Sequence, residues 1–240
     1  MADTAIPDTQ VIPELTSVSS DLRRAALGAC QDTSVFLTSP PSTYGRHVKP
    51  AMDALGSVVL LTALIPLVLA VAVLIRATMG RGVFFRQRRV GLNGKSFTMI
   101  KFRTMAPDRR IAQRPLKGSD RRVSHKREDD PRHTRVGRLL RKLSIDEIPQ
   151  LWNVVRGEMS LVGPRPELSN IVDTYEPWQH HRHVVKPGVT GLWQVTARGD
   201  GPMQQYTHID LEYIATVSLA TDIKILALTV PSVFGRRTGA

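Results

Sequence analysis

The chain has 240 residues and carries 33 Lys and Arg against 21 Asp and Glu, which gives a net charge of +12. Its length suits one domain with a sizeable core better than two full domains. The positive charge favours anionic partners such as phosphates, acidic lipid surfaces or nucleic acid, without choosing among them. The single cysteine, Cys30, excludes an internal disulfide, and no Cys and His spacing resembles a zinc site, so nothing indicates an oxidising compartment.

Residues 1–48 form a first segment that is rich in Ser, Thr, Pro and Asp and has no sustained apolar period. Such a segment buries too little surface to offset its ordering entropy, so a disordered tail is predicted. Its beginning lacks the basic region and the apolar run of a signal peptide, and we expect the catalytic parts to face the cytoplasm.

A membrane segment is predicted within residues 49–80. From Ala54 to Ile75 the chain runs for 22 residues without a charge, or about 33 Å as a straight helix, which is enough to cross the core of a bilayer. Pro66 lies near its centre, where a proline removes a backbone donor and kinks a helix. Positive residues, which favour the cytoplasmic side, flank both ends. We therefore predict a re-entrant helix that enters and leaves by one face, with a kinked single span as the alternative.

A β-hairpin is predicted over residues 83–102, because two extended runs are separated there by the turn residues Gly91, Asn93 and Gly94. Residues 107–132 then combine three prolines with many charges and no helical apolar stripe. This composition predicts a solvated loop or an arm on anionic headgroups.

Helical periodicity returns at residues 134–143. Apolar side chains fall there at i, i+3, i+4 and i+7 opposite a basic face, namely Val136, Leu139, Leu140 and Leu143. A second helix is predicted from Asp146 to Val155, and it ends at an Arg-Gly pair. Residues 209–230 mix apolar and charged side chains, and they either lie in the membrane interface or cover the core.

Asp146 and Glu147 stand together at the predicted start of the second helix. If Asp146 is the N-cap, Pro149 falls at N3, where its missing N–H costs no intrahelical bond. Free amides and the helix dipole stabilise negative charge at such a position, so a phosphate can approach the pair, particularly with a divalent cation between them. The alternative is a capping box, in which Glu147 only bonds back to the amide of Ser144.

Basic residues that can meet a diphosphate occur at separate places along the chain. They are Lys101 and Arg103, Arg141, and Arg165 within Pro164-Arg165-Pro166. Each stands beside a stiff or apolar neighbour instead of in a flexible run. An acidic pair with separated arginines suits phosphoryl transfer with a metal.

Three long stretches of the chain carry a family resemblance. They read FFRQRRVGLNGKSFTMIKFRTM, DDPRHTRVGRLLRKLSIDEIPQLWNVVRGEMSLVGPRPE and KPGVTGLWQV. Together they resemble the bacterial sugar transferase family, the monotopic polyprenyl-phosphate phosphoglycosyl transferases, over roughly residues 52–230. The resemblance implies an enzyme that moves a phosphosugar from a UDP-sugar onto undecaprenyl phosphate, releases UMP and uses Mg²⁺. It further implies a role at the start of polysaccharide or glycoconjugate assembly, in the bacterial inner membrane with the catalytic domain on the cytoplasmic face.

The resemblance also implies roles for individual residues. Asp146 is the implied nucleophile that forms an aspartyl phosphosugar, and Glu147 is an implied Mg²⁺ ligand, with Asp146 beside the same ion. Arg141 and Arg165 correspond to family positions near the phosphates, and Arg198 is a candidate for phosphate or nucleotide. The other expected substrate contacts are Lys101, Arg103, Pro164, Pro166, Trp193 and Gln194. Of these, Lys101 and Arg103 equally suit anchoring of the hairpin, and a buried tryptophan such as Trp193 is more often part of a core.

The expected fold is α+β and mainly helical, a monotopic membrane protein with an N-terminal re-entrant helix, a small β-hairpin and amphipathic interfacial helices. The expected parts are the tail 1–48, the membrane helix 49–80 and a cytosolic phosphoglycosyl transferase domain 81–235. The chain departs from the family where Ile65 replaces the serine of a Ser-Pro pair and where Val217 replaces a tryptophan. One hydrophobic segment matches the minimal catalytic form, and the sugar and the oligomeric state stay open.

Two further features of the sequence suggest other functions. His180, His181 and His183 suggest a metal site, but the segment lacks ordered acidic partners, so a solvated surface is preferred. The arginines of residues 109–127 suggest a membrane-anchored nucleic-acid binder, yet no recognition helix or series of stacking aromatics accompanies them, and we expect no nucleic-acid partner. A scaffold that only docks on lipid is the third alternative and predicts no activity.

Overall fold

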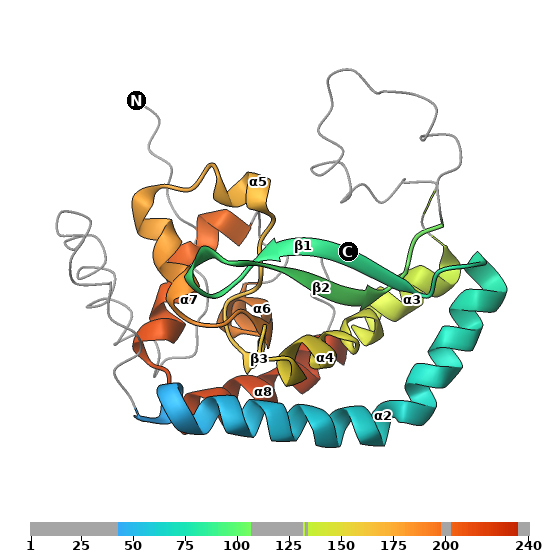
Figure 1. Cartoon of the computed structure of the whole chain (residues 1–240), viewed down its shortest axis with the longest axis horizontal. Helices are drawn as coiled ribbons and strands as arrows, with labels where there is room; N and C mark the ends of the chain where they lie inside the picture. Colours follow the sequence, from blue (N-terminus) through green and yellow to red (C-terminus); the bar gives the residue numbers. More distant parts are fainter. Residues whose placement is uncertain (1–42, 107–131, 133, 198–202, 235–240) are drawn as a thin grey trace.

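The structure is a computed structural model that describes residues 43–106, 132, 134–197 and 203–234 (Figure 1). Most of the predicted tail and of the basic loop at residues 107–132 lies outside the described residues. The helices are α2 (Lys49–Met79), α3 (Arg135–Lys142), α4 (Gln150–Val155), α5 (Ser169–Val172), α6 (Leu192–Thr196), α7 (Thr207–Ala215) and α8 (Leu219–Phe234). The strands are β1 (Phe84–Val90), β2 (Ser96–Phe102), β3 (Ser160–Val162) and β4 (Gly188–Thr190). Short helical turns are η1 (Tyr44–Val48), η2 (Leu92–Gly94), η5 (Ile145–Glu147), η6 (Pro177–Val184) and η7 (Met203–Tyr206). The mainly helical fold with a small hairpin is confirmed.

Helix α2 is long and apolar enough to cross a membrane, as predicted. Many of its large apolar side chains face outward, for example Leu55 and Val73, each 68% exposed. Pro66 lies inside the helix, and Figure 1 shows α2 as two straight legs that meet at a bend. A proline accounts for such a bend, because it removes one backbone hydrogen bond and its ring clashes with the preceding turn. A helix this apolar and this exposed indicates association with a membrane.

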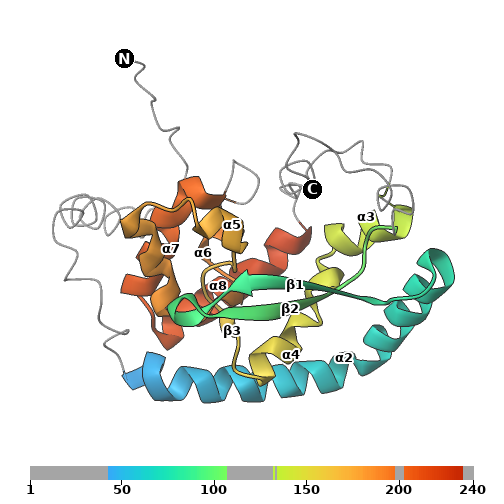
Figure 2. The ribbon, with the colours of Figure 1, turned by 45° about the horizontal axis from the view of Figure 1, so that its top comes forward.

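The second leg of α2 packs on the hairpin and on α3 (Figure 2). Ile75 and Met79 contact Phe102 at the end of β2 and Leu140 on α3, and all four are buried. Leu140 belongs to the apolar stripe predicted for this helix, whereas Leu139 of the same stripe is 54% exposed. The helix therefore presents apolar surface to the core and also outward.

The hairpin forms as predicted. Strands β1 and β2 pair antiparallel, from Phe84 opposite Phe102 to Val90 opposite Ser96. Asn93 (φ 52°) and Gly94 (φ 73°) make the left-handed turn that connects them. The hairpin is tied to α4 through Asn153, whose side chain accepts from the Ile100 amide (3.1 Å) and donates to the Thr98 carbonyl (2.8 Å).

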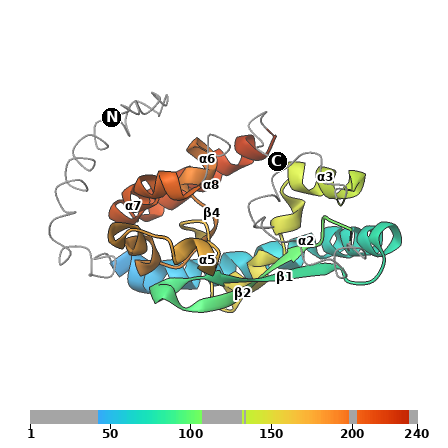
Figure 3. The ribbon, with the colours of Figure 1, turned by 90° about the horizontal axis from the view of Figure 1, so that it is seen from above.

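A second, two-stranded sheet joins β3 and β4 in parallel, with Ser160 opposite Gly188. A Cβ atom on Gly188 would lie 2.1 Å from the backbone nitrogen of Gly163, so only glycine fits this close approach. Helices α7 and α8 cover this sheet with Tyr213 and Ile225, which are each 1% exposed. Figure 3 shows α6, α7 and α8 on one side of the molecule, with the hairpin and α2 on the other. Residues 209–230 therefore cover the core with one face.

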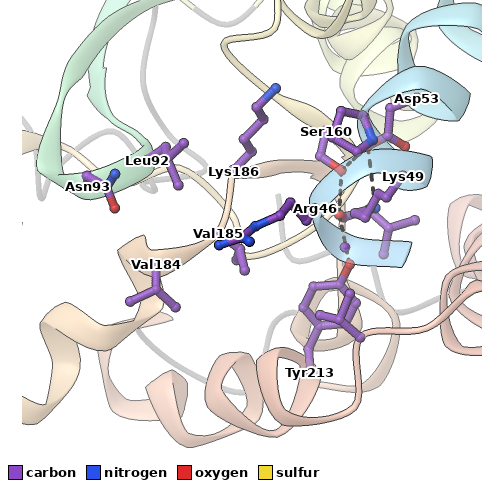
Figure 4. Close-up of a pocket in the computed structure, with 14 residues that line it drawn as sticks. Arg46, Lys49, Asp53, Leu92, Asn93, Ser160, Val184, Val185, Lys186 and Tyr213 are labelled. Carbon is purple, nitrogen blue, oxygen red and sulfur yellow. Dashed lines mark hydrogen bonds and ion pairs between the residues drawn. The ribbon is translucent and has the colours of Figure 1, made fainter. Parts of the chain in front are cut away.

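A buried polar network fixes the first turns of α2 to the rest of the fold, and Figure 4 shows four of its members, Lys49, Asp53, Ser160 and Tyr213. Lys49 Nζ lies 2.6 Å from Asp222 Oδ2 on α8 and 3.4 Å from Asp53 Oδ2. Ser160 on β3 donates to Asp53 (2.5 Å), and Tyr213 donates to Asp222 (2.8 Å). Buried charges are costly unless they are paired in this way. The pairing therefore sets the start of the membrane helix against the body that carries the site.

Candidate active site

Asp146 and Glu147 lie in the 3₁₀ turn η5, between α3 and α4. Ser144 precedes the turn in a left-handed conformation (φ 53°), which ends α3 and redirects the chain. Both carboxylates are buried, with 7% of Asp146 and 8% of Glu147 exposed. The prediction of one helix from Asp146 to Val155 is wrong at its start, because α4 begins only after Pro149, which is its N-cap and not N3.

The capping box that offered a purely structural explanation of the pair does not form. The Ser144 amide donates to the Arg141 carbonyl (3.0 Å), and the serine side chain makes no capping bond. Glu147 Oε1 instead accepts from Lys101 Nζ at 2.6 Å and from Arg165 Nη2 at 3.2 Å. Glu147 thus joins a charged cluster built from three separate parts of the chain.

The two cations reach Glu147 from elements that hold them in place. Lys101 stands on β2, where antiparallel pairing fixes its backbone opposite Phe85. Burial lowers the pKa of Lys101, against the opposing effect of the Glu147 carboxylate. Arg165 lies in the loop after β3, and Glu147 raises the pKa of its guanidinium. Two fixed cations beside two carboxylates make a site suited to phosphate oxygens and to transferred negative charge.

Burial raises the pKa of Asp146 to about 6, and the neighbouring Glu147 carboxylate adds to that rise. Lys101, Arg165 and Arg141 oppose it, because each favours the ionised carboxylate. Asp146 is therefore mostly ionised near pH 7 and poorly hydrated. Those are the properties of a carboxylate that can act as a nucleophile.

The loop that carries Arg165 is held by its two flanking prolines, both expected at the site. The Pro164 carbonyl accepts from the Gly188 amide (2.9 Å), and the Pro166 carbonyl accepts from Arg89 Nη1 (3.1 Å). Arg89 also pairs with Glu167 at 3.3 Å. These two bonds hold the backbone on either side of Arg165, and a contact of the prolines with substrate stays a prediction.

Arg103 is placed at the end of α2. Its guanidinium donates to the carbonyls of Met79 (2.8 Å), Gly80 (3.0 Å) and Arg81 (2.6 Å). These carbonyls belong to the C-terminal end of the helix, where a cation is favourable. This is the anchoring role that the sequence left open for Arg103, and a contact with substrate stays a prediction.

The remaining expected contacts lie farther along the chain. Trp193 is 8% exposed and packs in a small core with Ala197 and Tyr206. Gln194 donates from Nε2 to the Val189 carbonyl (2.9 Å) and lines a cavity that also includes Glu147. Arg198 lies outside the described residues.

Comparison with known proteins now decides the family. The family model described as bacterial sugar transferase matches residues 44–236. The chain belongs to the bacterial sugar transferase family. The exopolysaccharide production protein ExoY of Sinorhizobium fredii is 40% identical over 195 residues, which cover 79% of this chain and 86% of that protein. The sugar transferase EpsL of Bacillus subtilis is 40% identical over 186 residues, 78% of this chain and 87% of the relative. The UDP-glucose:undecaprenyl-phosphate glucose-1-phosphate transferase of Xanthomonas campestris is 41% identical over 198 residues, 79% of this chain but 39% of that longer protein.

One part of this sugar transferase site was not found from the sequence. Arg182 is 2% exposed, pairs with Asp210 at 2.6 Å and donates to the Arg165 carbonyl at 2.8 Å. Its Nη1 donates to the Tyr175 hydroxyl at 2.5 Å. The solvated surface predicted for this segment holds for the exposed His180 but is wrong for Arg182. Asp210 was the available signal in the sequence, because it lies three residues before Tyr213 and therefore on the same face of a helix. A carboxylate on a buried helix face requires a buried cation.

Proposed function

We propose that this sugar transferase moves a phosphosugar from a UDP-sugar onto undecaprenyl phosphate, releases UMP and thereby begins the assembly of a polysaccharide or glycoconjugate. The observation that carries the proposal is the buried Asp146 and Glu147 pair, with Lys101 and Arg165 bound to Glu147. The names of relatives support it, among them the undecaprenyl-phosphate galactose phosphotransferase of Salmonella typhimurium, 37% identical over 201 residues.

In the first half-reaction, an Asp146 carboxylate oxygen attacks the phosphorus that carries the sugar. A new oxygen–phosphorus bond forms while the bond from that phosphorus to the bridging diphosphate oxygen breaks, and UMP leaves with the electron pair. The product is an aspartyl phosphosugar. In the second half-reaction, a phosphate oxygen of undecaprenyl phosphate attacks the same phosphorus, and the aspartate leaves as a carboxylate. Two steps allow a soluble donor and a lipid acceptor to use one site in turn.

Lys101 and Arg165 supply positive charge on the side of Glu147, where the phosphate oxygens of the donor gather. Arg141 also favours the ionised form of Asp146. Because these cations are fixed before the substrate arrives, little reorganisation is needed when charge develops on the transferred group. Each also limits repulsion between the two carboxylates and the donor diphosphate.

A magnesium ion fits this donor set only in combination with substrate. Within residues 43–106, 134–197 and 203–234, no three His, Cys, Asp or Glu side chains group in a way that could hold a metal alone. Mg²⁺ in phosphoryl-transfer sites is typically bound by one or two carboxylates together with substrate phosphates. Asp146 and Glu147 would hold it, and it would neutralise charge on the diphosphate.

The membrane arrangement that we propose is re-entrant, in the bacterial inner membrane with the catalytic part on the cytoplasmic face. Its support is the bend in α2 with Pro66 inside the helix (Figure 1). The network of Lys49, Asp53 and Asp222 at the first leg, and the packing of Ile75 at the second, attach both legs to the same body. A helix held at both ends by one domain can return to the face it entered.

The test uses membranes that contain the full chain, magnesium and undecaprenyl phosphate, with a panel of UDP-sugars offered one at a time. UMP release with at least one donor is expected, and purified protein given that donor alone should gain the mass of one phosphosugar. A lipid-docking protein without catalysis would give no UMP from any donor. Turnover without added mass at residue 146 would remove the covalent step.

A further inference from the structure

A cavity of about 230 Å³ lies between the carboxylate turn and the α8 helix. Glu147 stands on its wall, next to Ile148, which precedes α4, and to Leu151 in the first turn of α4. The opposite wall comes from Val189 on β4 and from Thr229 on α8. The cavity therefore begins at Glu147 and extends between α4 and α8.

The polar side chains of the α8 wall are largely bonded within the protein. Thr229 Oγ1 lies 2.8 Å from Thr190 Oγ1 and donates to the Ile225 carbonyl at 2.7 Å. Ser232 donates to the Thr229 carbonyl at 2.8 Å. The surface that remains for a ligand is therefore mostly hydrocarbon, contributed by leucine, isoleucine and valine side chains. A hydrocarbon chain suits such a wall, whereas a sugar ring or a nucleobase would lose hydrogen bonds there.

One polar atom at the carboxylate end suits a phosphate. The Ser144 hydroxyl oxygen is buried and has no hydrogen-bond partner among the described residues, and Ser144 lines the cavity beside Glu147. A hydroxyl can donate to a phosphate oxygen. On the other wall, Gln194 Oε1 is a buried acceptor without a partner in the described part of the chain. A sugar hydroxyl would donate a hydrogen bond to that atom, so the sugar of the donor is the alternative occupant of the cavity.

Exposed apolar side chains stand next in sequence to residues of the cavity wall. Trp152 follows Leu151 on α4 and is 51% exposed, and Val230 follows Thr229 on α8 and is 60% exposed. Helix α4 packs along the apolar α2 helix. A lipid chain that leaves the bilayer beside α2 would therefore meet α4, the helix that forms one wall of the cavity.

We propose that this cavity binds the phosphate-proximal isoprenoid units of the acceptor lipid and delivers its phosphate to the end formed by Ser144 and Glu147. The inference rests on the proposed function, since it assigns the acceptor of that reaction to a place in the structure. It separates the two substrates: the donor diphosphate meets Lys101 and Arg165, and the acceptor chain lies between α4 and α8.

Two substitutions that fill the cavity from opposite walls test the proposal, namely Ser232→Phe on α8 and Leu151→Trp on α4. The matched control for Ser232→Phe is Ala227→Phe, which adds nearly the same bulk to an exposed position on α8 outside the cavity. We expect both cavity variants to raise the KM for undecaprenyl phosphate by about tenfold or more. Loading of the protein by the donor alone, read from the intact mass, should keep its wild-type rate, and the control should match wild type in both steps.

Binding is measured separately, with farnesyl phosphate as the probe and native mass spectrometry of the full chain as the readout. Farnesyl phosphate should bind wild type and the control, and it should be lost from both cavity variants, while inorganic phosphate and farnesol should bind weakly to all four proteins. Unchanged acceptor KM and unchanged probe binding in both cavity variants would overturn the proposal. A loss of donor loading with unaltered probe binding would assign the cavity to the sugar instead. If wild type shows no donor loading with any UDP-sugar, the proposed function fails, and the probe measurement still decides the cavity.

Discussion

Arg182 Nη2 donates a hydrogen bond to the backbone carbonyl of Arg165 at 2.8 Å, and the same atom lies 2.6 Å from Asp210 Oδ2. One buried guanidinium thus connects helix α7 to the loop that presents Arg165 to Glu147. Burial raises the pKa of Asp210, and Arg182 opposes that rise. Because the planar fork of arginine satisfies several acceptors at once, a single residue here sets both local stability and the position of a cation in the site.

Arg182→Lys is expected to keep the charge beside Asp210 but to lose the simultaneous bonds to the Arg165 carbonyl and to Tyr175. We expect UMP release to fall by about tenfold or more with a smaller loss of stability, since Arg165 is then less well placed. Arg182→Met should destabilise the fold by about 3–5 kcal/mol, because it leaves a buried aspartate unpaired. Tyr175→Phe is the control and should cost about 1 kcal/mol. Thermal unfolding and initial rates, measured on the same preparations, check these expectations, and full activity of Arg182→Lys would contradict the positioning role.

Sequence patterns predicted the parts of the fold that depend on neighbouring residues. The turn at Asn93 and Gly94, the apolar run of α2 and the stripe that contains Leu140 are all local signals, and each appears in the structure. The break between η5 and α4 could not be predicted in this way. Glu147 forms ion pairs with Lys101, 46 positions away in the sequence, and with Arg165, 18 positions away. These long-range ion pairs replace the capping bond that the local sequence favours.

In the candidate site, too, some residues carry a local sequence signal and others do not. The acidic pair and the Pro164-Arg165-Pro166 loop are visible as short motifs, whereas the pairing of Arg182 with Asp210 joins two segments whose local composition is unremarkable. Asp210, a charged residue on the buried face of α7, indicates that a buried cation is present, but the sequence does not show which residue supplies it. Only the packing of η6 against α7 brings the two together.

Asp146→Asn is expected to abolish UMP release and the gain of phosphosugar mass, because an amide oxygen is a poor nucleophile at phosphorus. The matched control is Asp173→Asn, at an exposed aspartate in the same chain. That variant should load and turn over as wild type does. If Asp146→Asn turned over near the wild-type rate, another group would be the nucleophile.

The pH dependence of donor loading should report the titration of Asp146, whose pKa is raised to about 6, chiefly by burial. A raised pKa means that the neutral form gains population as the pH falls through that value, so loading should decline below about pH 6 and reach a plateau above it. Glu147→Gln removes a neighbouring negative charge that helps raise this pKa, so the midpoint should move to lower pH. Rapid-quench measurements of loading between about pH 4.5 and pH 8 test both statements. A midpoint that stays in place in Glu147→Gln would show that the two carboxylates do not interact.

The same shift has a consequence for stability. Because the folded-state pKa lies above the value near 4 of an unfolded aspartate, Asp146 favours the folded state most at low pH and loses that contribution as the pH rises through about 6. Asp146→Asn is therefore expected to unfold at a higher temperature than wild type near pH 8, with a smaller difference near pH 4. Scanning calorimetry in detergent at the two pH values measures this difference in unfolding temperature. A variant less stable than wild type near pH 8 would indicate that the ionised carboxylate stabilises the fold.

Glu147→Gln is expected to raise the magnesium concentration needed for half-maximal UMP release, because a neutral amide is a weaker ligand for Mg²⁺ than a carboxylate. The exposed Glu176 offers a control as Glu176→Gln, which should leave the metal titration in place. Titrations at fixed donor and acceptor concentrations, repeated with Mn²⁺, make the comparison. Identical magnesium curves for Glu147→Gln and wild type would remove Glu147 from the metal site.

The topology of α2 can be read from cysteines placed beyond each end of the helix, in a Cys30→Ser background that leaves no other thiol. Val48→Cys and Arg81→Cys suit this purpose, since both positions are exposed, whereas Gly80 has φ 79° and would strain any other residue. With a re-entrant helix, a membrane-impermeant maleimide should label both cysteines from the cytoplasmic side of inverted vesicles and neither from the periplasmic side of spheroplasts. A single span predicts labelling from opposite sides. Pro66→Ala restores the missing backbone bond and favours a straight helix, so it should shift part of the population toward that second pattern.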